Sequence, residues 1–433
     1  MTDLKHLAAE CLAKLRAAGA DTARARLSLS EEREFNIDGG EFSLYRTTFN
    51  RSLTLTAFRE TRTGSVYLNS FDPKDINRAI SDCMRTVESD KPDPARGIAE
   101  NQGERDLTYG VPEPDAEKFF IRTRELKEEI GKRYPTILIE QMINSHSKTE
   151  SVYADTNGNL FHLYYGAYGV TLMFSAHRGD KSSSFMSCGY ETADLDTPLI
   201  DQGDIARVLS DVEKQIDTVP VTGSFTGTVI LAPDCLGGLL RSAIGCFASG
   251  APLIDGTSLW RDKLGKEVAS PNFTLSLAPH HPDAVLSQQL TSDGYLTEDF
   301  DLIKNGVLQS FVAEIYVANK AGVPRSKNTA TGWLAMPAGE KPLDELIAGI
   351  DDGLFVYRFS GGRPATNGDF SGVAKNSFRI KNGKVTDAVS ETMISGNLAD
   401  MLFRFIGASS ERVTNGYSHL PFAAFSGITI SGK

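Results

Sequence analysis

Alternating apolar and polar residues early in the chain constrain its fold more than any other feature. Between Ala23 and Ser70 the runs RARLSLS, FSLYRTT and SLTLTAF place apolar residues at every second position, and Asp38-Gly39-Gly40 and Gly64 break them. Successive side chains of a strand point to opposite faces, so this period of two predicts antiparallel strands with one buried face. Apolar residues at three- and four-residue steps predict flanking helices over residues 4–19 and 72–87.

The order of helix, strands and helix then occurs a second time. A helix is predicted over 115–132, strands over 137–186 and a further helix over 205–216, after a polar, turn-rich segment from Ser89 to Asp115. Regular alternation of strand and helix is missing, so we expect an α+β fold rather than a doubly wound parallel sheet. The expected units are a first α+β domain over residues 1–95 and a middle α+β domain over residues 110–218.

The last half of the chain has a different pattern. A short apolar strand, GTVILAP, precedes a helix that begins near Asp234, and beyond Leu275 the sequence consists of hairpin patterns. Two of these hairpins have nearly the same turn, at Asn305-Gly306 and at Asn382-Gly383, and Asn-Gly favours the tight turns of two-residue hairpins. We expect a β-rich C-terminal domain over residues 222–433.

Charge and cysteine content exclude several functions. The formal net charge is -11, and no run of Lys or Arg offers a surface for phosphates, so direct nucleic-acid binding is not expected. The N-terminus resembles no signal peptide, and no apolar stretch is long enough to cross a bilayer, so no membrane contact is expected. Five cysteines without CxxC spacing are typical of a reducing compartment. We expect a cytoplasmic protein.

One C-terminal segment carries a family resemblance. The sequence NGDFSGVAKNSFRIKNGKVTDAVSETMISGNLADMLFRFIGASS contains Gly-Asp-x-Ser, an Asn-Gly hairpin and Ser-Gly-Asn-Leu-x-Asp-Met in that order, and it resembles the TldD/PmbA family of bacterial peptidase-related proteins. The matching positions are Asp369, Ser371, Gly383, Ser395, Gly396, Asn397, Leu398 and Asp400. The segment DLIKNGVLQSFVAEIYVANKAGV is also similar to the family, with its recurring Ala and Gly at Ala318 and Gly322.

The resemblance also shows which residues are missing. TldD-type members carry His-Glu-x-x-x-His on the first helix of the C-terminal domain and a Cys near the terminus, a set that can hold zinc and activate water. Here that helix reads GGLLRSAIGCF, so Arg241, Ser242 and Cys246 stand at the positions of His, Glu and His, and no Cys follows Cys246. A guanidinium offers no lone pair to a metal. The resemblance therefore implies no catalytic residue, metal or cofactor in this chain, with zinc expected only in a TldD-type partner.

By resemblance, the chain is a TldE/PmbA-like, non-catalytic subunit of a metallopeptidase complex that trims unfolded peptides. Its partner would be a TldD-type subunit in a heterodimer, or a second copy in a homodimer. Arg241, Asp369 and Asn397 are candidates for the substrate cavity, and Arg241 could bind a peptide carboxylate. The simpler interpretations are an exposed or ion-paired Arg241 and a turn fixed by Asp369 and Asn397.

Two other functions stay open at this stage. The chain could be a self-sufficient metallopeptidase that uses unrecognised ligands, such as His280, His281 and a distant carboxylate. Against this, adjacent histidines point in different directions and no Asp or Cys stands beside them at ligand spacing, so loop residues are the simpler interpretation. The chain could also be a modulator of DNA gyrase that binds protein rather than DNA. Bound zinc and chelator-sensitive peptide cleavage would favour the first alternative.

Overall fold

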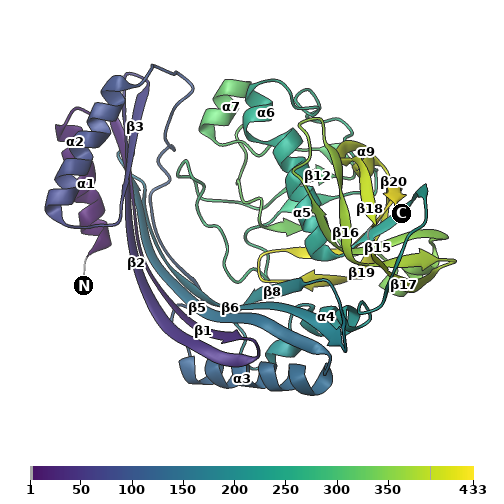
Figure 1. Cartoon of the computed structure of the whole chain (residues 1–433). Coiled ribbons are helices and arrows are strands. Elements are labelled where there is room, and N and C mark those ends of the chain that lie inside the picture. Colours follow the sequence, from purple (N-terminus) through teal and green to yellow (C-terminus); the bar gives the residue numbers. More distant parts are fainter. Residues whose placement is uncertain (1–2, 391) are drawn as a thin grey trace.

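Two β-sheets and the helices around them make up the chain (Figure 1). The computed structural model describes residues 3–390 and 392–433. The first sheet comes from the N-terminal half and curves around one side of the molecule, and the second sheet lies in the C-terminal half. The predicted α+β class is confirmed.

The first sheet has eight strands in the order β3-β2-β1-β5-β6-β4, with β7 and β8 also paired to β6. Its neighbours are antiparallel except β4 and β6, which run parallel. Four strands of 17 to 19 residues give the sheet its length, and Figure 1 shows them bending together. The strand bounds are β1 Thr22–Asp38, β2 Glu41–Arg59, β3 Arg62–Leu68, β4 Glu104–Gly110, β5 Ile137–Asp155, β6 Leu160–Arg178, β7 Lys181–Ser182 and β8 Met186–Thr192.

The two segments expected to be separate N-terminal domains share this sheet. Strand β1 pairs with β5 without interruption, from Arg24 opposite Asp155 to Asp38 opposite Gln141. The polar segment between them contributes β4, which pairs with β6. The repeated order of helix, strands and helix is present in the structure. The strands of its two copies form one sheet, joined by the hydrogen bonds between β1 and β5, rather than two sheets.

Four helices cover the first sheet. Their bounds are α1 Leu4–Ala17, α2 Pro73–Ser89, α3 Ala116–Arg133 and α4 Ile205–Glu213. Three begin at an aspartate whose carboxylate accepts a backbone N–H of the first turn: Asp3, Asp72 and Asp115. Helices α1 and α2 cover one end of the sheet, and α3 lies at the other end (Figure 1).

One predicted turn is wrong. The runs FSLYRTT and SLTLTAF belong to a single strand, β2, and the chain reverses at Glu60 and Thr61, which have φ of 50° and 65°. Gly64, expected to break the strands, lies inside β3. A Cβ there would stand 2.2 Å from the carbonyl oxygen of Cys83 in α2, so this glycine permits close helix packing rather than a turn.

The second sheet has twelve strands, ten of them in the order β13-β12-β11-β14-β20-β10-β15-β16-β17-β9. Strand β18 pairs with β16 and β20, and β19 pairs with β20. Both Asn-Gly turns are confirmed: Asn305 and Gly306 have φ of 50° and 81°, and Asn382 and Gly383 have φ of 47° and 72°. The bounds are β9 Thr218–Pro220, β10 Ser224–Leu231, β11 Leu275–Leu277, β12 Phe300–Lys304, β13 Val307–Leu308, β14 Leu334–Ala335, β15 Asp352–Gly361, β16 Asp369–Lys381, β17 Lys384–Ser390, β18 Met393–Asn397, β19 Phe405–Thr414 and β20 His419–Ser431.

Short helices surround this sheet, and a shared core joins it to the first. The helical bounds are η1 Leu199–Asp201, α5 Pro233–Ala243, η2 Ile244–Ala248, α6 Gly250–Ile254, α7 Ile315–Ala321, α8 Leu343–Ala348 and α9 Leu398–Phe403. One apolar cluster contains Phe174 of β6, Leu209 of α4, and Phe355 and Phe422 of the second sheet. The two sheets are therefore held by common buried surface. Within the described residues, no helix is both long enough and apolar enough to cross a membrane.

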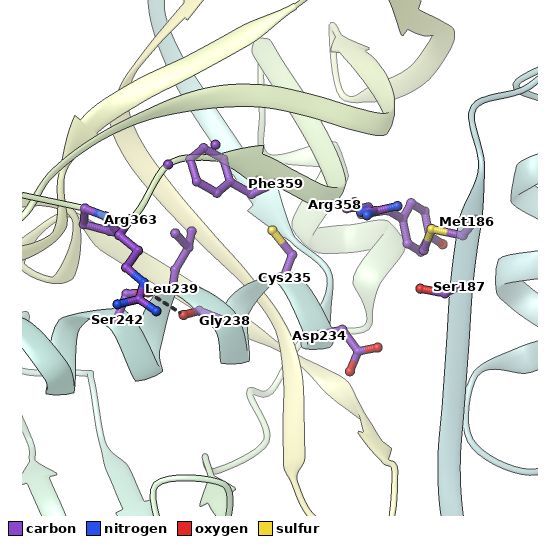
Figure 2. Close-up of a pocket in the computed structure, with 14 residues that line it drawn as sticks. Met186, Ser187, Asp234, Cys235, Gly238, Leu239, Ser242, Arg358, Phe359 and Arg363 are labelled. Atoms are coloured by element: carbon purple, nitrogen blue, oxygen red, sulfur yellow. Dashed lines mark hydrogen bonds between the residues drawn. The ribbon is translucent and has the colours of Figure 1, made fainter. Parts of the chain in front are cut away.

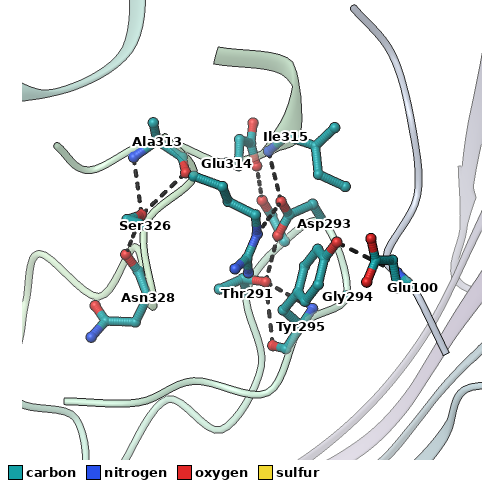
Figure 3. A network of polar contacts seen from close by, with 12 residues as sticks. Glu100, Thr291, Asp293, Gly294, Tyr295, Ala313, Glu314, Ile315, Ser326 and Asn328 are labelled. Carbon is teal, nitrogen blue, oxygen red and sulfur yellow. Dashed lines mark hydrogen bonds and ion pairs between the residues drawn. The ribbon is translucent and has the colours of Figure 1, made fainter. Parts of the chain in front are cut away.

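A polar network fixes a C-terminal loop against the first sheet. Arg24 and Arg26 of β1 each donate to a loop carbonyl, those of Ser292 and Thr291, at 3.1 Å. In the same loop the nearly buried Asp293 pairs with Arg325 and accepts from the backbone N–H of Ile315 at 2.8 Å (Figure 3). These contacts help set the position of the C-terminal half relative to the curved sheet.

Candidate functional site

Helix α5 lines a cavity of about 400 Å³ between the two halves of the chain (Figure 2). Strand β8 of the first sheet forms one wall, and β15 with the loop after it forms another. The lining residues are Met186, Ser187, Asp234, Cys235, Gly238, Leu239, Ser242, Tyr357, Arg358, Phe359, Gly361, Gly362, Arg363 and Pro364. This helix carries Arg241 and Ser242, two of the three positions at which the sequence resemblance implies substituted zinc ligands.

The local sequence explains how α5 is placed. Strand β10 ends in the buried residue Leu231, and Pro233 begins the helix directly after it, where its missing N–H costs nothing. On the sheet side, Gly237 lets the helix approach β20, since an added Cβ would stand 3.2 Å from Leu420 Cδ1. The helix is therefore pressed against the sheet, and its other face borders the cavity.

The three positions of the degenerate motif do not form a metal site. Ser242 lines the cavity but donates its hydroxyl to the carbonyl of Gly238 at 3.0 Å. Arg241 folds back along α5; burial raises the pKa of Asp234, and the Asn415 hydrogen bond and the positive charge of Arg241 oppose that rise. Cys246 lies past α5 in η2, where its thiol donates to Ala365 at 3.4 Å and burial raises its pKa. These residues do not fit zinc, because they offer no set of converging donors.

The cavity has cationic and acidic walls. Arg358 and the exposed Arg363 lie on the side of β15, and Asp234 lies on α5. Burial raises the pKa of Asp234, and burial together with the charge of Asp234 raises the pKa of neighbouring Asp204 to about 7. Burial also raises the pKa of Cys235 to about 12, so its thiol stays protonated and is a poor nucleophile. The arginines make the cavity suited to binding an anionic group.

Asp369 and Asn397 meet across neighbouring strands, away from this lining. They are opposite each other in the register of β16 and β18, and the Asn397 amide donates to Asp369 Oδ1 at 2.9 Å. Asn397 also donates to the carbonyl of Asn367 at 2.8 Å. Of the candidates for the substrate cavity, Asp369, Asn397 and Arg241 are not among its lining residues. The contacts of Asp369 and Asn397 are those of residues that fix a turn.

The two adjacent histidines lie in different surroundings. His280 Nε2 is 3.0 Å from the carbonyl oxygen of Thr297, whereas the His281 ring stacks on His419 with centroids 4.6 Å apart. The statement that no Asp stands at ligand spacing is wrong, because Asp283 Oδ2 lies 3.6 Å from His281 Nδ1 and 3.4 Å from His419 Nδ1. The His-Pro-Asp spacing could have indicated Asp283, but His419 is distant in sequence and only the fold brings it here.

Comparison with known proteins finds a family match in the C-terminal half of the chain. Residues 222–432 match the family model described as PmbA/TldA metallopeptidase C-terminal domain. Along its length the chain is 26% identical over 396 residues to "Metalloprotease PmbA" of Escherichia coli O157:H7, which covers 86% of this chain and 81% of that protein. The C-terminal half of the chain therefore matches the PmbA/TldD family.

Solved structures share the fold of the chain. TldE from Thermococcus kodakarensis has a TM-score of 0.84 at 20% identity and covers 98% of this chain and 100% of its own. A protein from Bacteroides thetaiotaomicron VPI-5482, named as a candidate modulator of DNA gyrase, has a TM-score of 0.85 at 23% identity, with 100% of both chains covered. At these identities the likeness establishes the fold and not the activity.

Proposed function

We propose that this chain is a TldE/PmbA-like subunit without a catalytic centre on α5, and that it joins a TldD-type partner around an unfolded peptide. The observation that carries the proposal is the cavity face of α5, which presents Asp234, Cys235 and Ser242 in place of a zinc-ligand set. A hydrolytic zinc site needs three converging donors, an open position for water and a base.

Each substituted position of the motif argues against a hydrolytic role for α5. Arg241 carries a guanidinium group, which has no lone pair for a metal. The Ser242 hydroxyl is already used by Gly238 within the helix, and the raised pKa of Cys246 keeps its sulfur protonated. The cavity therefore supplies a wall that holds substrate, and hydrolysis belongs to the partner.

The cavity is suited to binding the C-terminal end of a peptide. Arg358 and Arg363 present guanidinium groups on one wall, and a peptide has one obligatory anion, its C-terminal carboxylate. Arg358 is anchored by the ring of Phe185, 5.1 Å away, whereas Arg363 is exposed and free to meet a ligand. Recognition of this terminus would give little sequence specificity, as trimming of unfolded peptides requires.

The exposed first half of β2 supports the proposal that this chain binds a partner subunit. Residues 41–47 of this strand are exposed on both faces, and large apolar side chains lie among them and just beyond. Phe42, Leu44 and Tyr45 are 40%, 43% and 57% exposed, and Phe49 is 73% exposed. Several large apolar side chains exposed along one strand favour a protein contact. A TldD-type chain or a second copy of this chain would cover it.

Association is tested by light scattering on the purified chain, alone and mixed with a TldD-type protein that carries His-Glu-x-x-x-His. We expect a complex, and we expect Phe49→Asp to weaken it at least tenfold by placing a charge in the buried contact. Tyr67→Asp is the matched control, because Tyr67 is 68% exposed but lies on β3. The proposal fails if no complex forms, or if both variants associate like the unchanged chain.

A further inference from the structure

We propose that His281, Asp283 and His419 form a binding site for a divalent transition-metal cation of the zinc class, separate from α5. Each of these side chains offers a ligand atom, and the three atoms lie within 4.8 Å of one another. Within residues 3–390 and 392–433, no other group of three His, Cys, Asp or Glu side chains meets this condition. The proposed subunit role does not depend on this site.

The distances fit metal ligands better than hydrogen bonds. Asp283 Oδ2 is 3.4 Å from His419 Nδ1 and 3.6 Å from His281 Nδ1, which is long for a charge-assisted hydrogen bond. In a tetrahedral zinc site with bonds of 2.0 to 2.1 Å, neighbouring ligand atoms stand about 3.3 Å apart. The two Asp283 distances are already near that spacing, and the two histidine atoms, within 4.8 Å of each other, would approach to about 3.3 Å around a cation.

The histidines present ring nitrogens beside the Asp283 carboxylate. Only 12% of the His419 side chain is exposed. Its Nδ1, the atom near Asp283, also contacts the hydroxyl of Thr414, a contact that coordination through Nδ1 would replace. Its Nε2 is buried without a hydrogen-bond partner. Two imidazoles beside one carboxylate select a transition metal over Ca²⁺ or Mg²⁺, which prefer oxygen ligands.

The backbone holds the ligands in place before any metal binds. His281 and Asp283 lie in one turn, closed by a hydrogen bond of 2.8 Å from the Ala284 N–H to the His281 carbonyl. The Val285 N–H donates to the Gly416 carbonyl at 3.1 Å, which ties this turn to the hairpin before His419. His281 Nδ1 accepts a 3.2 Å hydrogen bond from the Asp283 N–H, a contact that coordination through this atom would replace.

The site is open on one side. Asp283 has a half-exposed side chain and borders two spaces: a gap of about 10 Å³ beside both histidines and a cavity of about 570 Å³. The gap has room for about one water-sized occupant. Three protein donors leave a fourth tetrahedral position, so water or a small ligand from the larger cavity can complete the coordination.

Cobalt(II) titration of metal-free full-length protein tests this site, because tetrahedral Co²⁺ absorbs visibly and zinc displaces it. We expect one equivalent bound and displaced by Zn²⁺, with affinity reduced at least about tenfold in Asp283→Asn and in His281→Gln. His280→Gln is the matched control and should bind as the unchanged chain does. Circular dichroism confirms folding, and Asp283→Asn alters an exposed side chain, so loss of fold does not obscure the result.

Equal cobalt affinity in the unchanged chain, Asp283→Asn and His281→Gln would overturn the site, as would the absence of a stoichiometric cobalt signal. The variants Ser242→Ala and Cys246→Ser test whether cobalt instead binds at the altered motif on α5 and η2. We expect neither to change cobalt binding. Binding lost in those two variants and retained in Asp283→Asn would place the metal on α5, and it would contradict both this inference and the proposed subunit role.

Discussion

Asn397 donates an amide N–H to Asp369 Oδ1 at 2.9 Å while its own Oδ1 accepts the backbone N–H groups of Ala399 and Asp400 at 2.9 and 3.3 Å. One side chain thus joins β16 to β18 and caps helix α9. The same hydrogen bond is the largest influence that lowers the pKa of Asp369. The Ser-Gly-Asn-Leu motif therefore encodes a strand-to-helix junction.

Replacing Asn397 with alanine should destabilise the chain by about 1 to 2 kcal/mol, because the helix cap and the bond to Asp369 are both lost. Urea denaturation measures the change. Asn397→Asp keeps an oxygen for the cap but removes the donor and sets a carboxylate against Asp369, so it should also destabilise. An unchanged midpoint for both variants would show that this junction contributes nothing.

Gly383→Ala should destabilise the chain by roughly 1 to 3 kcal/mol. Gly383 has φ of 72°, and an added Cβ would stand 2.7 Å from the carbonyl oxygen of Ala348. Gly131→Ala is the control: this glycine lies in α3 with no heavy atom within 4 Å of an added Cβ. The control should gain about 0.5 to 1 kcal/mol, because alanine favours a helix. Thermal unfolding of both variants measures whether stability falls in Gly383→Ala and rises in Gly131→Ala.

Stability should fall as pH rises from about 4 to 7. Burial, with the charge of Asp234 as a smaller cause, raises the folded-state pKa of Asp204 to about 7, and burial alone raises that of Glu191 to about 7. Between the unfolded and folded pKa values, the folded state keeps a proton that the unfolded chain has lost. Each group therefore lowers the free energy of unfolding by up to about 1.4 kcal/mol per pH unit in that window.

Asp204→Asn tests this pH dependence. The variant carries no charge at this position, so its free energy of unfolding should decline less between pH 4 and 7 than that of the unchanged chain. It should also be the more stable of the two at pH 8, since the repulsion with Asp234 is gone. Asp262→Asn, at an exposed position, is the control and should leave the profile as it was. Parallel profiles for all three proteins would contradict the raised pKa of Asp204.

Arg363→Glu should weaken binding of a peptide with a free C-terminus about tenfold or more, because an anion then faces the peptide carboxylate. The same peptide with an amidated C-terminus should bind both proteins weakly. Arg105→Glu, a change at another exposed arginine, serves as the control. Calorimetric titration measures all of these affinities. Equal affinity for free and amidated peptides would rule out carboxylate recognition in this cavity.

Local chemistry allowed much of the fold to be predicted. Helices α1, α2 and α3 and the two Asn-Gly turns have short-range physical causes, and these elements lie where the patterns placed them. Gly64 was wrongly predicted to break the strands. A glycine is needed there because α2 packs closely against it, and the residues around Gly64 do not reveal that contact. The pairing of β1 with β5 was equally invisible, since strand periodicity does not specify which strand is the neighbour.

The site was predictable only in part. The substitution of the zinc motif at Arg241, Ser242 and Cys246 is visible in the sequence, and the position of α5 beside a cavity agrees with its importance. The cationic wall was missed, because Arg358 and Arg363 belong to a strand and loop more than 100 residues away. His419 approaches His281 for the same reason, through strand pairing that no local pattern records.

The most direct test of the proposed subunit role is peptide cleavage by the purified chain in zinc-supplemented buffer, with and without a TldD-type protein. We predict no cleavage by the chain alone and chelator-sensitive cleavage by the mixture, lost when the partner's His-Glu-x-x-x-His motif is altered. Chelator-sensitive cleavage by the chain alone would contradict the account, and its loss in Asp283→Asn would assign that activity to the histidine and aspartate site.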